Sequence, residues 1–403
     1  MRAALELHDE PASHRGAQIG LAVSASPLRR AWTASALIVF NTALLFLLAN
    51  GLSWLWLRAR FPMPAPRQWH MERGSGLPLK PVFPELSDAQ IARLMEETWT
   101  RTHAFEPFTG HRERPFAGEW VNVDEHGYRR TDQRAPWPPV RGKSVFLFGG
   151  STTFGMGVPD GQTIAAHLER ALHRTDPSIH VYNFGRGYYY SQQERALFIS
   201  LLEQNAIPAL AVFIDGLNDF ILQDPAYSDR LRRFMDGGVA QVSPRQRLPL
   251  VVVVRGLLAD VRDSSGGAEA SGEPGDTVLD ASSVIERYIA SKQIVEAVAS
   301  THEVKTLFVW QPVPTYNYDL QHHLFMTDRG WRSNSGDRTR DGYREFASRI
   351  AQDPQPGLLW LADLQQELRE PLYVDQVHYT GAMSRRIAEA IAERITSGQL
   401  LEQ

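Results

Sequence analysis

The chain has 403 residues, of which 43% are hydrophobic and 22% are charged, so it is long enough for a large globular domain with additional segments and does not have the composition of a disordered protein. Its formal net charge is -4 and no long basic run occurs, which argues against a nucleic-acid partner. Because it has no cysteine, thiol catalysis, cysteine-bound zinc and disulfide bonds are excluded, whereas an oxidising compartment stays open.

The N-terminal part of the sequence predicts a membrane anchor. Residues 1–30 are polar and are interpreted as a mobile tail. Residues 31–57 contain no charged side chain, and an apolar stretch of this length spans a hydrocarbon core as a helix. Trp32 near one end and Trp54 and Trp56 near the other are typical of interfacial aromatic belts. A cleaved signal peptide is the alternative, which a long leader and the lack of a small-residue cleavage site disfavour.

The charges beside this anchor do not determine its orientation in the membrane. Arginines lie on both sides of the apolar segment, so the positive-inside rule does not decide between the two directions. A short leading tail before a large following domain is typical of anchors whose domain lies outside the cytoplasm. We therefore expect a single-pass membrane protein with a periplasmic or extracellular domain.

Residues 58–140 predict a Pro-rich spacer and a membrane-proximal segment. Residues 61–84 are rich in proline, most densely at residues 61–66, which indicates a stiff, extended spacer. Ser87 and Asp88 can cap a following helix, whose apolar face contains Ile91, Leu94, Met95 and Trp99. Residues 121–131 predict a strand or hairpin edge that leads into the main domain, and no chemistry is assigned to it.

Residues 141–403 form the predicted main domain, in which strand-like and helix-like patterns alternate. The predicted strands are residues 145–148, 179–184, 210–214, 306–310 and 358–361. Residues 191–194 predict a capping box that opens a helix, and the Gly-rich residues 262–277 predict a flexible surface loop. This alternation predicts a three-layer α/β/α sandwich with a central, mostly parallel sheet, preceded by the single transmembrane helix.

Polar residues follow the predicted strands and precede the last helix. Ser151 comes after the first strand and two glycines, Asn218 follows the third strand, and Asp375 and His378 come just before the final helix. Because the carboxyl ends of parallel strands meet at one edge of a sheet, we expect these residues to lie together. A serine nucleophile needs a base, an acceptor that orients the base and donors for the oxyanion, and each role has a candidate.

Residues of this kind are also explained by structure alone. Serine and aspartate cap helices, glycine permits turns and asparagine closes Asx turns. This alternative applies to Ser151, Gly187, Asn218, Asp375 and His378. Their joint occurrence in this order favours the catalytic interpretation over five separate structural ones.

Four short blocks between residues 143 and 395 resemble those of the SGNH hydrolases, also called the GDSL esterase/lipase superfamily. The blocks are GGSTTFG, NFGRG, GLND and DQVH, in this order. The resemblance implies a flavodoxin-like SGNH fold and a site that needs no cofactor and no metal. It also implies that Ser151 is the nucleophile, Asp375 the triad acid and His378 the triad base. The backbone and side-chain oxyanion donors that it implies are Gly187 and Asn218.

The sequence departs from the family pattern at two places. The first block reads GST where the superfamily's name derives from GDS. In the second block the family's glycine often comes five residues after the asparagine, whereas Gly187 comes four after Asn183 and Tyr188 takes the fifth place. The backbone donor is therefore Gly187 or Tyr188. An α/β-hydrolase elbow fits less well because Thr153 replaces its last glycine, and a P-loop lacks its Gly-Lys-Ser/Thr.

The resemblance and the anchor together predict a membrane-bound serine esterase. Its expected substrates are acyl esters or O-acetylated glycans of the cell envelope or of secreted polysaccharide, and its expected membrane contact is through residues 31–57. The same residues can instead pass an acetyl group to a glycan hydroxyl, so an O-acetyltransferase is the first alternative. A non-catalytic carbohydrate-binding or scaffold protein is the second, and retention of all the triad positions argues against it.

Overall fold

The computed structural model describes residues 27–60, 79–132, 134–221, 279–326 and 334–401, together with residues 248, 250, 251, 253 and 254. The chain divides into two compact units, one formed by residues 1–62 and 243–267 and the other by residues 63–242 and 268–403. Residues 61–78 of the predicted spacer lie outside the described residues, as do the predicted loop at residues 262–277 and most of the predicted tail.

The first unit contains a long apolar helix, α1 (Pro27–Arg60). Between Leu28 and Trp56 its 29 residues span about 43 Å, more than the roughly 30 Å of a hydrocarbon core. None of this stretch is buried inside the protein, and its large apolar side chains are exposed. Within the described ranges α1 is the one helix that is long and apolar enough to cross a membrane. The helix predicted at residues 31–57 is confirmed and extends beyond both predicted ends.

Five parallel strands form the central sheet of the second unit. They are β5 (Ser144–Gly149), β6 (His180–Asn183), β7 (Leu210–Asp215), β8 (Lys305–Trp310) and β9 (Leu358–Trp360). Their order across the sheet, β6-β5-β7-β8-β9, is the flavodoxin-like order 2-1-3-4-5 of a doubly wound sheet. Every residue of β5 and β7 is buried, as expected when helices cover both faces. The predicted three-layer fold is confirmed.

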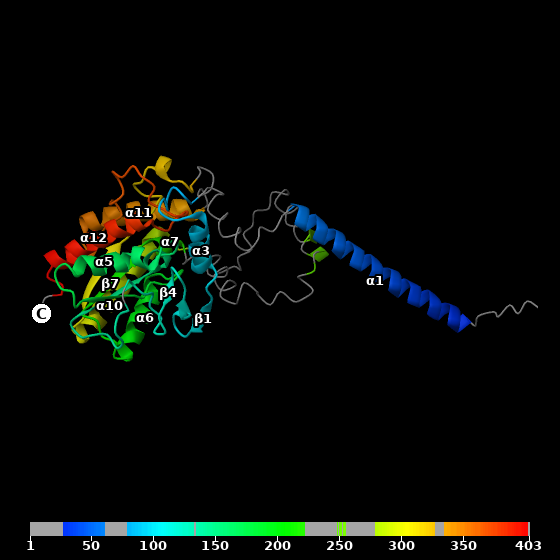
Figure 1. The fold of residues 1–403 in the computed structure, drawn as a ribbon, viewed down its shortest axis with the longest axis horizontal. Coiled ribbons are helices and arrows are strands. Elements are labelled where there is room, and N and C mark those ends of the chain that lie inside the picture. The colour runs from blue at the N-terminus through cyan, green and yellow to red at the C-terminus, as the bar shows by residue number, and fades with distance from the viewer. Residues whose placement is uncertain are drawn as a thin grey trace, which may run out of the picture. The chain divides into compact units, whose positions relative to one another are not determined.

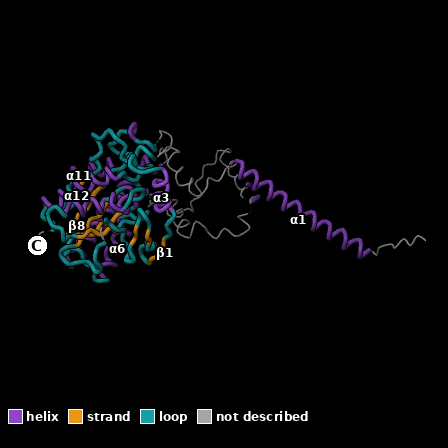
Figure 2. The backbone as a smooth tube through the Cα atoms, in the orientation of Figure 1, coloured by secondary structure: helices purple, strands orange, loops and turns teal. Residues whose placement is uncertain are grey.

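The helices divide between the two faces of this sheet. One face is covered by α5 (Ile164–Leu172) and α12 (Gly381–Ser397), and the other by α6 (Ser191–Glu203), α10 (Ala281–Thr301) and α11 (Asn334–Gln352) (Figure 1). In β5, Val145 and Leu147 pack toward the first group, whereas Phe146 and Phe148 pack toward the second. Figure 2 shows the strands in orange among these helices. The alternation of side chains along each strand thus supplies both hydrophobic cores.

Residues 79–140 belong to the same compact unit as the sheet. They contain α3 (Asp88–Trp99), the hairpin of β1 (His103–Glu106) and β2 (Gly110–Glu113), and the short pair of β3 (Phe116–Ala117) and β4 (Asn122–Val123). Leu94 of α3 shares a buried cluster with Phe154 and Val374 of the main domain. Arg129 forms an isolated bridge with Asn183 at the end of β6. The boundary at residue 140 stays a prediction, but the two sides of it share one core.

Local predictions in this unit had different outcomes. The helix expected after Ser87 is confirmed, with a capping box between Ser87 and Gln90. The extended segment expected over residues 121–131 is reduced to β4 and the bridge at Arg129. The capping box expected at the start of α6 is wrong, because the Ser191 hydroxyl donates to Asp219 at 2.6 Å instead of capping its own helix.

Candidate active site

Loops from distant parts of the sequence meet at the carboxyl edge of the sheet. Ser151 begins the short helix α4 (Ser151–Phe154) directly after β5, and Asn218 lies in α7 (Leu217–Ile221) directly after β7. Asp375 and His378 lie in the loop before α12. This edge is where doubly wound sheets place their ligand sites.

Ser151, His378 and Asp375 form a continuous hydrogen-bonded chain. The Oγ atom of Ser151 lies 2.8 Å from Nε2 of His378, and Nδ1 of His378 lies 2.6 Å from Oδ2 of Asp375. Because a carboxylate only accepts, Nδ1 carries the hydrogen and Nε2 is left to accept the serine proton. This is the spacing and order of roles that a Ser-His-Asp triad requires.

Asp375 is held in its ionised form by several donors. Its Oδ1 accepts the backbone N–H groups of Val377 and His378, each at 2.9 Å, while Oδ2 faces the imidazole. Desolvation alone raises the pKa of Asp375. The charge and hydrogen bond of His378, together with the two backbone donors, outweigh desolvation, so the pKa lies below its ordinary value. The carboxylate therefore stays charged and orients the ring.

The loop of Asn218 closely approaches the turn that carries Ser151. A Cβ atom on Gly150 would lie 2.3 Å from Nδ2 of Asn218 and 3.1 Å from the carbonyl oxygen of Tyr189. Only glycine fits a backbone so closely packed. The Asn218 amide donates to the Tyr189 carbonyl at 2.6 Å, which uses one of its two hydrogens and fixes the side chain beside the turn of Ser151.

The two candidates for the backbone oxyanion donor differ in conformation. Tyr188 has a φ of +66°, in the left-handed region that glycine adopts at little cost and bulky residues seldom adopt. The carbonyl of Gly187 accepts a hydrogen bond from Nε2 of His111 at 2.8 Å. Tyr188 thus has a backbone conformation that favours glycine, and the assignment of the donor to Gly187 or Tyr188 stays a prediction.

A buried network holds the loop of these two residues. Nη1 of Arg186 donates to the carbonyl of His111 at 3.1 Å and to Oη of Tyr189 at 2.8 Å, and it pairs with Glu106. Burial, reinforced by the charge of His103, lowers the pKa of His111 to about 4. His111 is therefore neutral at pH 7. No sequence pattern indicated this network, because its members come from the hairpin and from the loop after β6.

Trp99 is a further neighbour of the triad that sequence reasoning missed. Its ring centroid lies 5.5 Å from that of His378, with an interplanar angle of 67°, so the two rings meet edge to face. The sequence predicted Trp99 on the apolar face of its helix, and this periodicity carries no information about a residue near the other end of the chain.

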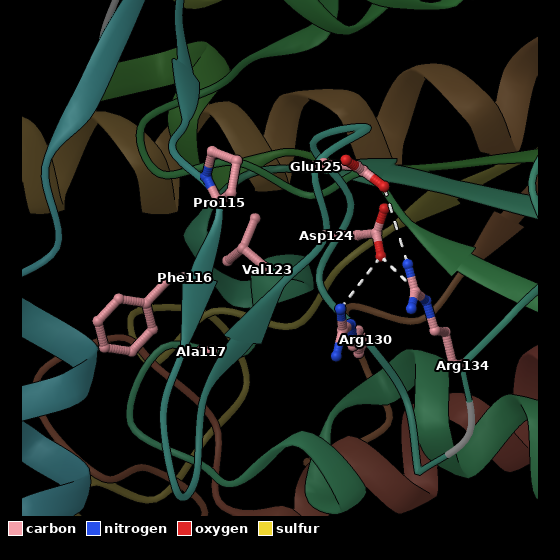
Figure 3. Close-up of a pocket in the computed structure, with 8 residues that line it drawn as sticks. All are labelled: Pro115, Phe116, Ala117, Val123, Asp124, Glu125, Arg130 and Arg134. Carbon is pink, nitrogen blue, oxygen red and sulfur yellow. Dashed lines mark hydrogen bonds and ion pairs between the residues drawn. The ribbon is translucent and has the colours of Figure 1, made fainter.

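A separate pocket lies beside the β3–β4 pair (Figure 3). It is lined by Pro115, Phe116, Ala117, Val123, Asp124, Glu125, Arg130 and Arg134. Asp124, Glu125 and the neighbouring His126 bring three ligand types close together. However, Arg130 and Arg134 lie 3.4 Å and 3.8 Å from Asp124, and their guanidinium charges balance the carboxylates. No predicted catalytic residue lines this pocket, and we assign it no metal.

The strand order and the hydrogen-bonded chain at Ser151 define the class of protein. It is an α/β protein with a doubly wound parallel sheet and a serine-histidine-aspartate arrangement at the carboxyl edge of that sheet.

Solved structures similar to this chain have low sequence identity to it. No protein-family model and no curated protein sequence matches the chain. Similar solved structures include Axe2, an acetylxylan esterase from Geobacillus stearothermophilus, with 15% identity over 63% of this chain and 94% of that chain and a TM-score of 0.35. A lipolytic protein of the G-D-S-L family from Veillonella parvula has 11% identity over 64% and 99% of the two chains, also with a TM-score of 0.35. The esterase EstA from Pseudoalteromonas has 12% identity over 64% and 98%, with the same TM-score.

Proposed function

We propose that the chain is a membrane-anchored serine esterase that hydrolyses carboxylic esters, including acetyl esters. The observation that carries this proposal is the hydrogen-bonded chain from Asp375 through His378 to Ser151. A capping role would not need an imidazole on the serine hydroxyl with a carboxylate behind it.

The first half of the reaction is acyl transfer to the enzyme. The Oγ atom of Ser151 attacks the ester carbonyl carbon while Nε2 of His378 removes the hydroxyl proton. Asp375 stabilises the imidazolium that forms, because its charge faces Nδ1 at 2.6 Å. Collapse of the tetrahedral intermediate breaks the ester C–O bond, and His378 gives its proton to the departing alcohol. The product is an acyl ester on Ser151.

The second half returns the enzyme to its starting state. A water molecule gives a proton to His378 as its oxygen attacks the acyl carbonyl carbon. The intermediate then collapses, the Ser151 oxygen leaves with the proton from His378, and a carboxylic acid is released. In both halves the negative oxygen is bound by the backbone N–H of Ser151, the side-chain amide of Asn218 and the N–H of Gly187 or Tyr188.

The anchor narrows the setting of this reaction. Helix α1 has the length and apolar surface of a membrane span, which supports single-pass anchoring through residues 31–57. With the catalytic domain outside the cytoplasm, the accessible esters are those of cell-envelope or secreted glycans. We therefore propose acylated or acetylated glycans as the substrate class.

Turnover of an aryl acetate by the full chain in lipid nanodiscs tests this proposal. We expect Ser151→Ala to lower kcat by roughly 10⁴-fold or more, whereas Thr152→Ser, which changes the neighbouring hydroxyl residue conservatively, keeps most of the activity. Addition of an oligosaccharide separates hydrolysis, which releases acetate, from transfer, which acetylates the sugar. Full activity of Ser151→Ala would contradict the proposed nucleophile.

A further inference from the structure

The tip of the β1–β2 hairpin exposes two large aromatic side chains. Phe105 is 83% exposed and Phe108 is 99% exposed. Phe108 also has a φ of +66°, a conformation that costs a bulky residue free energy, and no burial of its ring offsets that cost. A polar residue or glycine would serve the turn better. The fold of this chain alone therefore does not account for phenylalanine at this position.

The hairpin is firmly attached to the site-bearing part of the protein. The Thr109 hydroxyl donates to Oε2 of Glu106 at 2.6 Å, and Nε2 of Gln193 donates to the Thr109 carbonyl at 2.7 Å. Glu106 pairs with the buried Arg186, and Oη of Tyr189 donates to the hairpin at 2.5 Å. The exposed rings are thus fixed beside the loop that carries the candidate oxyanion donors.

The charges of the hairpin favour a negatively charged surface over a neutral one. Its two acidic side chains are turned toward cations of the protein, Glu106 toward Arg186 and Glu113 toward Arg101. Arg114 is exposed and Arg112 is partly exposed on the second strand and just after it. Aromatic side chains with adjacent arginines are the combination that binds the interface of an anionic membrane.

We propose that the tip of this hairpin docks into the headgroup layer of the membrane that holds α1, with Phe105 and Phe108 inserted and Arg112 and Arg114 on the lipid phosphates. This inference rests on the membrane anchoring in the proposed function. Residues 61–78 connect α1 to the first described residue of the second unit, and eighteen residues reach at most roughly 60 Å. The tether therefore keeps the membrane at a high effective concentration for the hairpin.

Docking of this kind narrows the substrate class. The hairpin contacts the loop after β6, so the membrane surface would lie beside the site at Ser151. An ester presented at the membrane, on a lipid-linked or membrane-associated glycan, is then favoured over one on a freely diffusing molecule.

Single-cysteine spin labelling of the full chain tests this inference directly, since the native sequence has no cysteine. The probe membrane is a nanodisc of phosphatidylethanolamine and phosphatidylglycerol. One label replaces Phe108, and a matched control replaces Thr175, an exposed residue before β6 at the opposite edge of the sheet. We expect the label at 108 to collide several-fold more often with lipid-soluble oxygen than with a water-soluble nickel complex, and the label at 175 to show the reverse. Phe105→Ser in the same chain should reduce the difference at 108.

Each outcome separates this inference from the anchor on which it rests. If the chain stays with the nanodisc and the labels at 108 and 175 both collide mainly with the nickel complex, the docking is overturned and the anchor stays intact. The exposed rings would then be explained by a protein partner. A chain that leaves the nanodisc would remove the anchor and this inference together. The aryl acetate assay does not depend on docking of the hairpin, so it tests the esterase proposal independently.

Discussion

In the proposed mechanism, Asn218 is the side chain that donates to the oxyanion. Its amide is fixed by the Tyr189 carbonyl at 2.6 Å and packs against Gly150, next to the nucleophile. Because the amide acts on charge that develops in the transition state, we expect Asn218→Ala to lower kcat roughly 100- to 1000-fold with little change in KM. Steady-state turnover of an aryl acetate measures both constants.

A control substitution separates the loss of kcat in Asn218→Ala from a loss that any asparagine substitution would cause. Asn205 is an exposed asparagine after α6 with a φ of +60°, so Asn205→Gly fits its backbone and should leave kcat unchanged. An unchanged kcat in Asn218→Ala, with the same thermal unfolding midpoint as the parent, would remove Asn218 from the site.

Trp99 is expected to act as a positioning residue through its edge-to-face contact with His378. Small displacements of a catalytic base are costly, so we expect Trp99→Ala to lower kcat about 10-fold with a smaller effect on KM. Trp99→Phe keeps an aromatic ring and should recover most of kcat. Equal kcat values for Trp99→Ala and the parent protein would show that the ring only fills space.

Single residues were predictable where their chemistry and spacing formed a pattern. Ser151, Asp375 and His378 lie in short blocks with a fixed order, and the structure brings them within hydrogen-bonding distance. Trp99 and His111 are separated from those blocks along the chain and belong to no motif. Their proximity to the site is a consequence of tertiary packing, which local periodicity does not encode.

At the scale of elements, Asp219 joins the start of α6 to the turn after β7. It accepts the Ser191 hydroxyl at 2.6 Å and the N–H groups of Ser191 and Gly216 at 3.3 Å. We expect Asp219→Ala to lower the free energy of unfolding by roughly 1–3 kcal/mol, since buried donors lose their acceptor.

The matched variant, Asp219→Asn, removes the charge, keeps one carbonyl oxygen as an acceptor for Ser191 and replaces the oxygen that accepts from Gly216 with an amide donor. Burial raises the pKa of Asp219, so a neutral side chain is tolerated there, and Asp219→Asn should be much closer to the parent in stability. Denaturant unfolding followed by circular dichroism compares the variants. A larger loss for asparagine than for alanine would contradict the role of Asp219 as a hydrogen-bond acceptor.

The elements of the main domain were more predictable than those of residues 79–140. Strands such as β5 and β7 are short, continuous apolar runs, because both of their faces are covered. The hairpin strands HAFE and GHRE contain buried histidine and glutamate and have no apolar alternation. They are stabilised by polar contacts with Arg101, Arg186 and Gly187, which cannot be inferred from the strands themselves.

At the scale of the whole molecule, buried neutral histidines predict a loss of stability in acid. Burial lowers the pKa of His111 to about 4, with a further contribution from the charge of His103, and burial also lowers the pKa of His323 to about 4. Between pH 6.5 and 4 these two histidines bind more protons in the unfolded chain than in the folded one, so their contribution to the free energy of unfolding falls as the pH falls. The buried carboxyls of Glu194, Asp215 and Asp219, whose pKa values burial raises, contribute with the opposite sign. Each histidine contributes on the order of 3 kcal/mol across this window.

Thermal unfolding of the full chain in nanodiscs, followed by near-ultraviolet circular dichroism, measures this effect. We expect the unfolding midpoint to fall less between pH 6.5 and pH 4 in His323→Gln than in the parent chain, because glutamine takes up no proton. An equal pH dependence of the two midpoints would show that His323 is protonated as readily in the folded chain as in the unfolded one.

The overall architecture followed from the alternation of patterns, whereas the association of residues 79–140 with the sheet did not. The sequence favoured a spacer because residues 61–84 are rich in proline, which is typical of an extended connection. The shared core of Leu94, Phe154 and Val374 depends on contacts between distant segments, which composition does not report.

The most direct test of the account is covalent labelling of the full chain by a fluorophosphonate, followed by mass-spectrometric mapping of the modified residue. The reagent reacts with a serine whose proton is removed by a neighbouring base. During this reaction the oxyanion donors bind the phosphoryl oxygen of the reagent. We predict a single modified residue, Ser151, and loss of labelling in Ser151→Ala and in His378→Ala. Labelling at another residue, or no labelling of a folded chain, would contradict the proposed nucleophile.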